Sequence, residues 1–212
     1  MFQLATVDET GTPRVRSIIN RAFLVPPSST ALPLLVASTD IRTPKVQHIA
    51  QVHTVELAWW INATQDQFRI SGPARIVAAP EHSFSSPPRD APGPDCAGIK
   101  ALEAAGIDWE AKRRELFDAV NEQMRATWCR PPPGSLLKGG YEEMNDWPAK
   151  VPKPSDAKTE KEKKLAELAL SNYAIIVIEP LYVDWVQMAI KPNRRTFFTR
   201  EGIDWKEDIV VP

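Results

Sequence analysis

The sequence has few of the residues that build disulfide frameworks or metal centres. It contains two cysteines, Cys96 and Cys129, and three histidines among 212 residues, and neither set shows metal-ligand spacing. A disulfide-stapled secreted scaffold is therefore disfavoured, a reduced cytoplasmic chain is expected, and no metal site is predicted. A Gly-x-Ser-x-Gly elbow and a Walker-type loop are also missing, so no independent catalytic motif is recognised.

An excess of charge of one sign is also missing. The chain has 26 basic and 27 acidic side chains and a net charge of −1, so neither nucleic acid nor an anionic membrane is expected as a partner, and any anion site must be local. Apolar runs stay shorter than the roughly 18 residues of a membrane helix. The N-terminal MFQLATVDETG lacks the basic start and apolar stretch of a signal peptide. The length suits one domain.

Proline, in contrast, is abundant. Many of the 20 prolines cluster in 85–95 and 130–135, which are predicted to be loops because proline lacks a backbone donor. Good helix formers follow in 99–107, 109–128 and 156–170. We therefore expect a helical, proline-rich insertion at about 80–171 within a single domain of 1–212.

Short extended segments flank this insertion on both sides, separated by turns. Their number and length favour a mainly β fold, an antiparallel barrel with helices outside it, over a parallel sheet. Gly72-Pro73 predicts a bulge or an edge position in its segment. The segments are 2–7, 13–25, 31–38, 54–61, 67–79, 172–180, 181–189, 194–200 and 205–212.

Residues 38–49, STDIRTPKVQHI, place anion-binding groups where a buried strand ends and a helix begins. Thr43 is predicted as the N-cap and Pro44 as the first helical residue, and His48 is expected on the solvated side. Helix N-termini bind anions through free N–H groups and the helix dipole. The pattern indicates a phosphate site; the alternative is ordinary capping with solvated cations. The candidate phosphate ligands are Ser38, Thr39, Arg42 and Lys45, with both cations at the surface.

Two further segments carry polar side chains on strands. RVRSIINR (14–21) holds three arginines on an apolar strand. In QFRIS, alternation places Gln67, Arg69 and Ser71 on one face and the two apolar residues on the other. The simplest interpretation is exposure to water; the alternative is a shared polar ligand.

The residues RSIINR (16–21), ASTDIRTPK, QFRI (67–70), Trp185 and Arg194-Arg195, in this order, resemble the pyridoxamine 5′-phosphate oxidase-like FMN-binding family. The similarity is greatest to the branch with a degenerate substrate site, and it spans most of 2–79 and 172–212. It implies a six- to eight-stranded, Greek-key split β-barrel with flanking helices, binding FMN at a homodimer interface. The FMN-binding residues that it implies are Arg16, Ser17, Ile18, Ile19, Arg21, Ser38, Thr39, Arg42, Lys45, Gln67, Ser135, Trp185 and Arg195.

One feature of this set conflicts with strand geometry. Arg16 and Arg21 are five residues apart, so strict alternation directs them to opposite faces. Both can contact one flavin only if the strand bulges or if two subunits contribute. Trp185 has a second interpretation as an ordinary core or dimer contact.

The family's substrate site is not recognisable in the middle of the chain, and KPNRRTFF near the end lacks the expected histidine. Lys191 and Arg194 remain candidates for holding a substrate anion, and no catalytic residue is identified. The sequence therefore favours an FMN-dependent oxidoreductase acting on an unidentified small substrate, with NAD(P)H as a possible donor. The alternatives are a flavin carrier or sensor, a pyridoxamine/pyridoxine 5′-phosphate oxidase, or a related barrel using haem or a deazaflavin.

Overall fold

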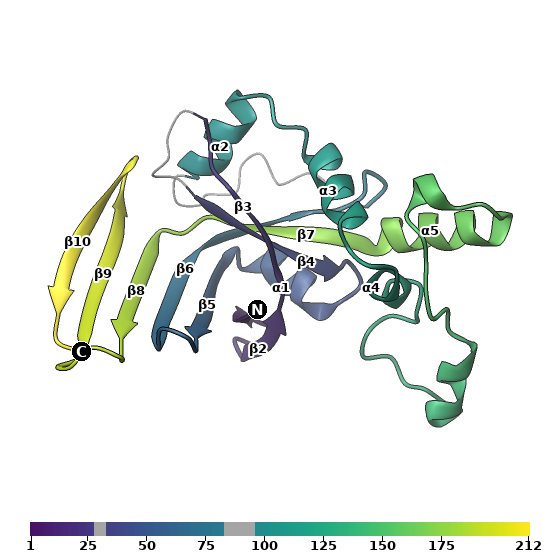
Figure 1. The fold of residues 1–212 in the computed structure, drawn as a ribbon, viewed down its shortest axis with the longest axis horizontal. Helices are drawn as coiled ribbons and strands as arrows, with labels where there is room; N and C mark the ends of the chain where they lie inside the picture. Colours follow the sequence, from purple (N-terminus) through teal and green to yellow (C-terminus); the bar gives the residue numbers. More distant parts are fainter. Residues whose placement is uncertain (28–32, 83–95) are drawn as a thin grey trace.

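A computed structural model describes residues 1–27, 33–82 and 96–212. Its core is a curled, ten-stranded antiparallel sheet that forms a half-barrel (Figure 1). The strands are β1 (Phe2–Val7), β2 (Pro13–Ile18), β3 (Asn20–Leu24), β4 (Leu34–Asp40), β5 (Thr54–Ile61), β6 (Asp66–Val77), β7 (Tyr173–Ile178), β8 (Tyr182–Gln187), β9 (Arg194–Glu201) and β10 (Asp204–Val210).

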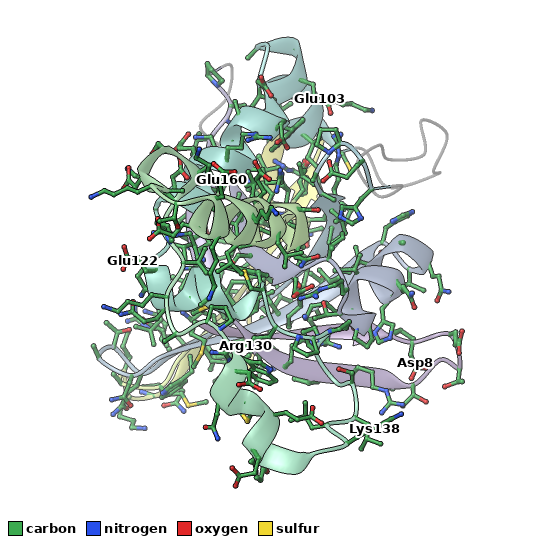
Figure 2. All side chains as sticks on the ribbon, turned by 90° about the vertical axis from the view of Figure 1, so that its right-hand side faces the viewer. Asp8, Glu103, Glu122, Arg130, Lys138 and Glu160 are labelled. Carbon is green, nitrogen blue, oxygen red and sulfur yellow. The ribbon has the colours of Figure 1, made fainter. Side chains whose placement is uncertain are left out.

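The helices lie mainly in one stretch of the chain, between β6 and β7. This stretch contains α2 (Ala97–Ala104), α3 (Trp109–Asp118), α4 (Glu122–Thr127), α5 (Glu160–Asn172) and the 3-10 helices η2 (Gly140–Asp146) and η3 (Pro154–Asp156). The helix α1 (Pro44–Gln51) lies earlier in the chain, between β4 and β5. Figure 1 shows α4 and α5 at the end of the molecule opposite β8–β10, and α2 above the sheet next to β3; Figure 2 marks these three helices by Glu122, Glu160 and Glu103. The antiparallel split barrel with flanking helices is thus confirmed.

The ten strands exceed the six to eight implied by the resemblance. They correspond to the nine extended segments of the sequence, of which the segment 13–25 divides into two. It breaks at Ile19 into β2, which pairs with β1, and β3, which pairs with β4. The segment 109–128 also divides, because the Asn121 side chain accepts a hydrogen bond from the Met124 backbone N–H and caps a new helix. Of the proline-rich loops, 130–135 is confirmed and 85–95 lies outside the described residues.

β6 changes its partner at the predicted irregularity. Its first half pairs with β8 and its second half with β7, and Gly72-Pro73 separates the halves. A Cβ atom at Gly72 would lie 1.9 Å from the carbonyl oxygen of Glu179, so only glycine permits this close approach of two backbones.

Alternation along β4 separates two apolar cores. Leu34 and Val36 face the helices α2–α5, whereas Leu35 and Ala37 face α1 and β1 on the other side. Both sides are buried, which explains the continuous apolar run of this strand. Among the residues that the structure describes, none of the helices combines the length and apolar character that crossing a bilayer takes.

Candidate functional site

The junction between β4 and α1 gathers hydroxyl groups around one lysine. The Lys45 ammonium group donates hydrogen bonds to Thr39 Oγ1 (3.1 Å) and Thr43 Oγ1 (2.8 Å). Thr43 occupies the predicted N-cap position and Pro44 the first turn, but the Thr43 hydroxyl bonds the Asp40 carbonyl at 2.7 Å instead of capping the helix. Lys45 is partly buried, so the expectation that it lies at the surface is wrong.

A second cation approaches this lysine from β2. Arg16 Nη1 donates to Thr6 Oγ1 (2.7 Å) and to the Leu4 carbonyl (3.1 Å). Burial and, next, the Arg16 guanidinium lower the pKa of Lys45 to about 8, against a smaller opposing effect of Asp40. Two neighbouring cations are therefore incompletely neutralised by the chain, and an anion bound between them would relieve their repulsion.

His48 completes the cluster and corrects a prediction. Its Nδ1 lies 3.0 Å from Thr6 Oγ1, and the ring is partly buried rather than solvated. Thr6 and His48 could not be found from sequence, because their contact depends on how α1 packs across β1. We refer to Arg16, Lys45, Thr39, Thr6 and His48 as the cation cluster.

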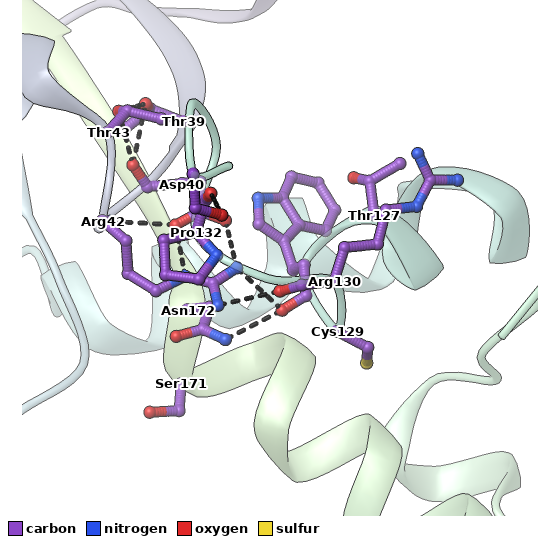
Figure 3. Close-up of polar contacts among 12 residues, drawn as sticks. Thr39, Asp40, Arg42, Thr43, Thr127, Cys129, Arg130, Pro132, Ser171 and Asn172 are labelled. Atoms are coloured by element: carbon purple, nitrogen blue, oxygen red, sulfur yellow. Dashed lines mark hydrogen bonds and ion pairs between the residues drawn. The ribbon is translucent and has the colours of Figure 1, made fainter. Parts of the chain in front are cut away.

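Arg42 belongs to the same junction between β4 and α1, but its side chain contacts Asp40 and the backbone near Arg130 (Figure 3). Its guanidinium pairs with Asp40 (Nη2–Oδ2 2.6 Å) and donates to the Arg130 (2.9 Å) and Trp128 (3.3 Å) carbonyls. The side chain is 23% exposed and Asp40 only 8%. Arg42 thus ties the junction to the segment after α4, and the expectation of a free surface cation is wrong.

Arg21 and Ser38 meet on the opposite side of β4. Arg21 Nε donates to Ser38 Oγ at 2.8 Å, on the face that carries Leu34 and Val36. The register of β3 against β4 shifts between Asn20 and Ala22, so the bulge required by the spacing of the arginines is present. It does not bring Arg21 to the cation cluster, because adjacent β4 residues face opposite sides.

An aromatic row crosses the core-side face of the sheet, the face that carries the buried Phe2, Leu4 and Leu57. Phe68 and Trp185 stack with centroids 5.7 Å apart at 10°, and Phe68 is paired across the strands with Trp59. Trp185 Nε1 donates to Asp66 Oδ1 at 2.9 Å. Arg16 is on the same face, opposite Leu4, so the cation cluster and an aromatic surface share one side of the sheet.

The outer face carries a different polar group. A hollow of about 240 Å³ is lined by Glu56, Arg69, Ser71, Tyr182, Asp184 and Arg195. Burial of Asp184 tends to raise its pKa, but hydrogen bonds from Arg195 and Arg69 outweigh it and lower the pKa. The predicted sharing of one face by Gln67, Arg69 and Ser71 is confirmed by the pairing of β6 with β5 and β8.

The predicted cofactor residues therefore do not converge within one chain. Ser17, Gln67 and Arg195 belong to the outer face, and Ile18 is buried in the core. Ile19 is 37% exposed between β2 and β3. Ser135 is exposed and donates to the Pro132 carbonyl at 2.7 Å.

The two substrate candidates are also solvent-exposed. Lys191 donates to Met188 O (3.3 Å) and Asn193 Oδ1 (3.1 Å), and Arg194 begins β9 as an exposed residue. Within the described residues, neither side chain contacts the cation cluster, so the structure does not join the substrate candidates to it.

Comparison with known proteins bears on this arrangement. Residues 1–78 match the family model described as pyridoxamine 5′-phosphate oxidase, FMN-binding domain. Pyridoxine/pyridoxamine 5′-phosphate oxidase 2 of Arabidopsis thaliana is 25% identical over 199 residues, covering 93% of this chain and 77% of that protein. The resemblance to the pyridoxamine 5′-phosphate oxidase-like FMN-binding family is confirmed.

Two solved structures support the same fold. A pyridoxamine 5′-phosphate oxidase-related, FMN-binding protein from Nostoc punctiforme PCC 73102 aligns with a TM-score of 0.66 and 21% identity over 100% of this chain and 87% of that chain. PhzG from Burkholderia lata 383, solved with tetrahydrophenazine-1-carboxylic acid, aligns at 0.58 and 15% identity over 100% and 81%. The region matching the FMN-binding domain contains the whole cation cluster, whereas Trp185 and Arg195 lie beyond it.

Proposed function

We propose that the protein binds FMN and uses it as an oxidoreductase on a small substrate. The observation that carries the proposal is the incompletely neutralised pair Arg16 and Lys45, which lies inside the region matching an FMN-binding domain. A phosphate dianion suits this pair, because each charge-assisted hydrogen bond to it contributes about 1.5–3 kcal/mol.

The residues present fit FMN at two points. Lys45 and Arg16 would hold the phosphate, with the Thr39 hydroxyl as a further donor once Lys45 turns toward the anion. The aromatic row containing Trp185 and Phe68 offers an apolar surface for a ring system. Arg42 is assigned a structural role, because most of its N–H groups already have partners within the chain.

We propose further that the site is completed by a second copy of the chain. Gln67 and Arg195 lie on the outer face, so they and the cation cluster cannot contact one flavin from the same sheet. A homodimer in which the outer face of one copy approaches the cluster of the other would join the two sets.

Bound FMN would supply the redox chemistry. The chain's own residues would bind the phosphate, orient the rings against the aromatic row and exclude water there. A cation near the flavin would stabilise negative charge on the reduced cofactor. In the proposed dimer, Arg195 of the second copy, whose Nη2 donates to Asp184 Oδ2 at 2.9 Å, would supply this cation.

The first test is the absorption spectrum of the purified protein and the mass of what it releases on denaturation. We expect a flavin spectrum and the mass of FMN at one per chain. A colourless protein that gives no calorimetric signal with added FMN would refute the proposal; a haem spectrum or a deazaflavin mass would replace it.

The second test separates an enzyme from a carrier or sensor. Anaerobic addition of NADPH or NADH should bleach the flavin, and oxygen should restore its colour. Oxidation of pyridoxamine 5′-phosphate is the second candidate activity, favoured by the Arabidopsis relative that matches 93% of the chain. Oxygen consumption with pyridoxamine 5′-phosphate decides between the two activities.

A further inference from the structure

The hydroxyl group of Thr6 joins two side chains of the cation cluster that come from different elements. Thr6 Oγ1 lies 2.7 Å from Arg16 Nη1, on β2, and 3.0 Å from His48 Nδ1, on α1. Thr6 itself is on β1 and only 2% exposed, so the hydroxyl is largely shielded from water. Three elements of the fold therefore meet at one buried oxygen atom.

The chemistry of the three groups assigns the hydrogen atoms between them. A guanidinium can only donate, so Arg16 donates to Thr6 Oγ1 and the single hydrogen of the hydroxyl is left for an acceptor. Within the described residues, the acceptor in contact with the hydroxyl is His48 Nδ1. A proton on Nδ1 would make both neighbours donors to Thr6 and leave a buried O–H hydrogen without a partner, which is unfavourable. His48 is therefore unprotonated at Nδ1, and a hydrogen-bond chain runs from Arg16 through Thr6 to His48.

This hydrogen-bond chain fixes one end of the Arg16 guanidinium and leaves the other end available. Nη1 makes both contacts to β1, one to the Thr6 hydroxyl and one to the Leu4 carbonyl at 3.1 Å. In the part of the protein that the structure describes, Nε and Nη2 donate to no other group, and the side chain is partly exposed. This edge of the guanidinium can form the paired bonds that arginine makes to two oxygen atoms of a phosphate.

The helix α1 brings His48 and Lys45 to the same place. They are three residues apart, a spacing that puts two side chains on one side of a helix, and the apolar side of α1 packs on the sheet. The Arg16 guanidinium lies close enough to Lys45 to lower its pKa. The anchor at Thr6 thus determines how Arg16 is held next to that lysine.

We propose that His48 is a positioning residue for anion binding. By accepting the hydrogen of the Thr6 hydroxyl, it turns an oxygen lone pair of Thr6 toward Arg16 and holds the guanidinium beside Lys45. Without this acceptor the hydroxyl can rotate, and Arg16 loses a directed anchor. The inference rests on the phosphate site of the proposed function and identifies the residues that orient its arginine.

An NMR spectrum of the apoprotein tests the hydrogen-bond chain without any ligand. Histidine is labelled with ¹⁵N, and two-bond ¹H–¹⁵N correlations are recorded under mildly alkaline conditions, in which imidazole groups are uncharged. We expect Nδ1 of His48 to show the shift of an unprotonated, hydrogen-bonded nitrogen, and Thr6→Val to move it toward the shift of an unbonded one. The signals of His53, the control, should not move. A proton on Nδ1, or a shift that Thr6→Val leaves unchanged, would overturn the proposal.

Titration with FMN tests the positioning role. His48→Phe removes the acceptor and Thr6→Val removes the hydroxyl, so each should raise the dissociation constant about tenfold, the equivalent of one hydrogen bond. The double variant should bind no more weakly than Thr6→Val alone, because both changes break the same hydrogen-bond chain.

Conservative variants separate positioning from a general loss of packing. His48→Asn, whose Oδ1 can replace Nδ1 as acceptor, and Thr6→Ser, which keeps the hydroxyl, should each bind FMN within about threefold of wild type. His53→Phe, outside the cluster, should leave the affinity unchanged. Circular dichroism confirms that each variant is folded before its affinity is compared.

The outcomes distinguish this inference from the proposed function. If wild type binds FMN and His48→Phe binds it equally well, or if His48→Asn loses as much affinity as His48→Phe, the proposed function stands and the role of His48 is refuted. Additive losses in the double variant would contradict it as well. A wild-type protein that does not bind FMN refutes the proposed function and this role of His48 together.

Discussion

Replacing Lys45 by methionine removes its charge and keeps most of its apolar volume. If Lys45 holds the FMN phosphate, the variant loses a charge-assisted hydrogen bond of about 1.5–3 kcal/mol. The dissociation constant of FMN should then rise about 10- to 150-fold at pH 7. The measurement is quenching of FMN fluorescence on titration with apoprotein, and Lys206→Met, which removes a cation paired with Asp208 on β10 at 2.8 Å, is the control.

The pH dependence makes this test sharper. The pKa of Lys45 without ligand is about 8, and a bound phosphate would raise it. FMN binding therefore takes up a proton above pH 8, and the affinity of the wild type should fall as the pH rises through that value. The Lys45→Met variant should lack this decrease.

The free energy of unfolding of the apoprotein should rise with pH over the range in which the affinity for FMN falls. Below pH 8 both the folded and the unfolded chain carry the proton on Lys45, and the cost of burying its charge is fully present. Between pH 8 and the ordinary value of 10.5 only the unfolded chain keeps that proton, so this group makes the free energy of unfolding rise with pH. Urea denaturation of the wild-type and Lys45→Met apoproteins at several pH values measures this pH dependence of the free energy of unfolding. A variant that binds FMN within twofold of wild type, or keeps the same pH dependence, would refute the assignment.

Three further substitutions test the framework of the site. Arg42→Ala should lower the free energy of unfolding by about 3 kcal/mol or more, because Asp40 is left buried without its partner. Arg14→Ala, which breaks an exposed pair, should lower it by less than about 1 kcal/mol. Urea denaturation measures both values. Trp185→Ala should weaken FMN binding several-fold with the fold retained by circular dichroism, whereas unchanged affinity would leave this residue as core packing alone. Gly72→Ala should lower the melting temperature markedly, since its Cβ atom would overlap a backbone carbonyl at 1.9 Å; a melting temperature within a degree of wild type would contradict that geometry.

Local patterns in the sequence were sufficient to predict the strands and the helix that carry the site. A buried strand followed by Thr43-Pro44 predicted the strand-to-helix junction, and α1 begins at Pro44. Alternation placed Gln67, Arg69 and Ser71 on one face, because the side-chain period of a strand is two residues wherever the strand lies. These features depend on neighbours in the chain, which the sequence specifies directly.

Tertiary structure decided which of these groups act together. Ser38 and Thr39 are adjacent in sequence, yet one bonds Arg21 and the other Lys45, because they project from opposite faces of a strand that is buried on both sides. Arg42 and Lys45 looked equivalent as cations, but the packing of the segment after α4 against the junction gave most of the N–H groups of Arg42 a partner. The sequence by itself determined the chemistry available at this junction, whereas strand register and long-range packing determined which cation remains available for an anion, because contacts between distant segments leave no local pattern to read.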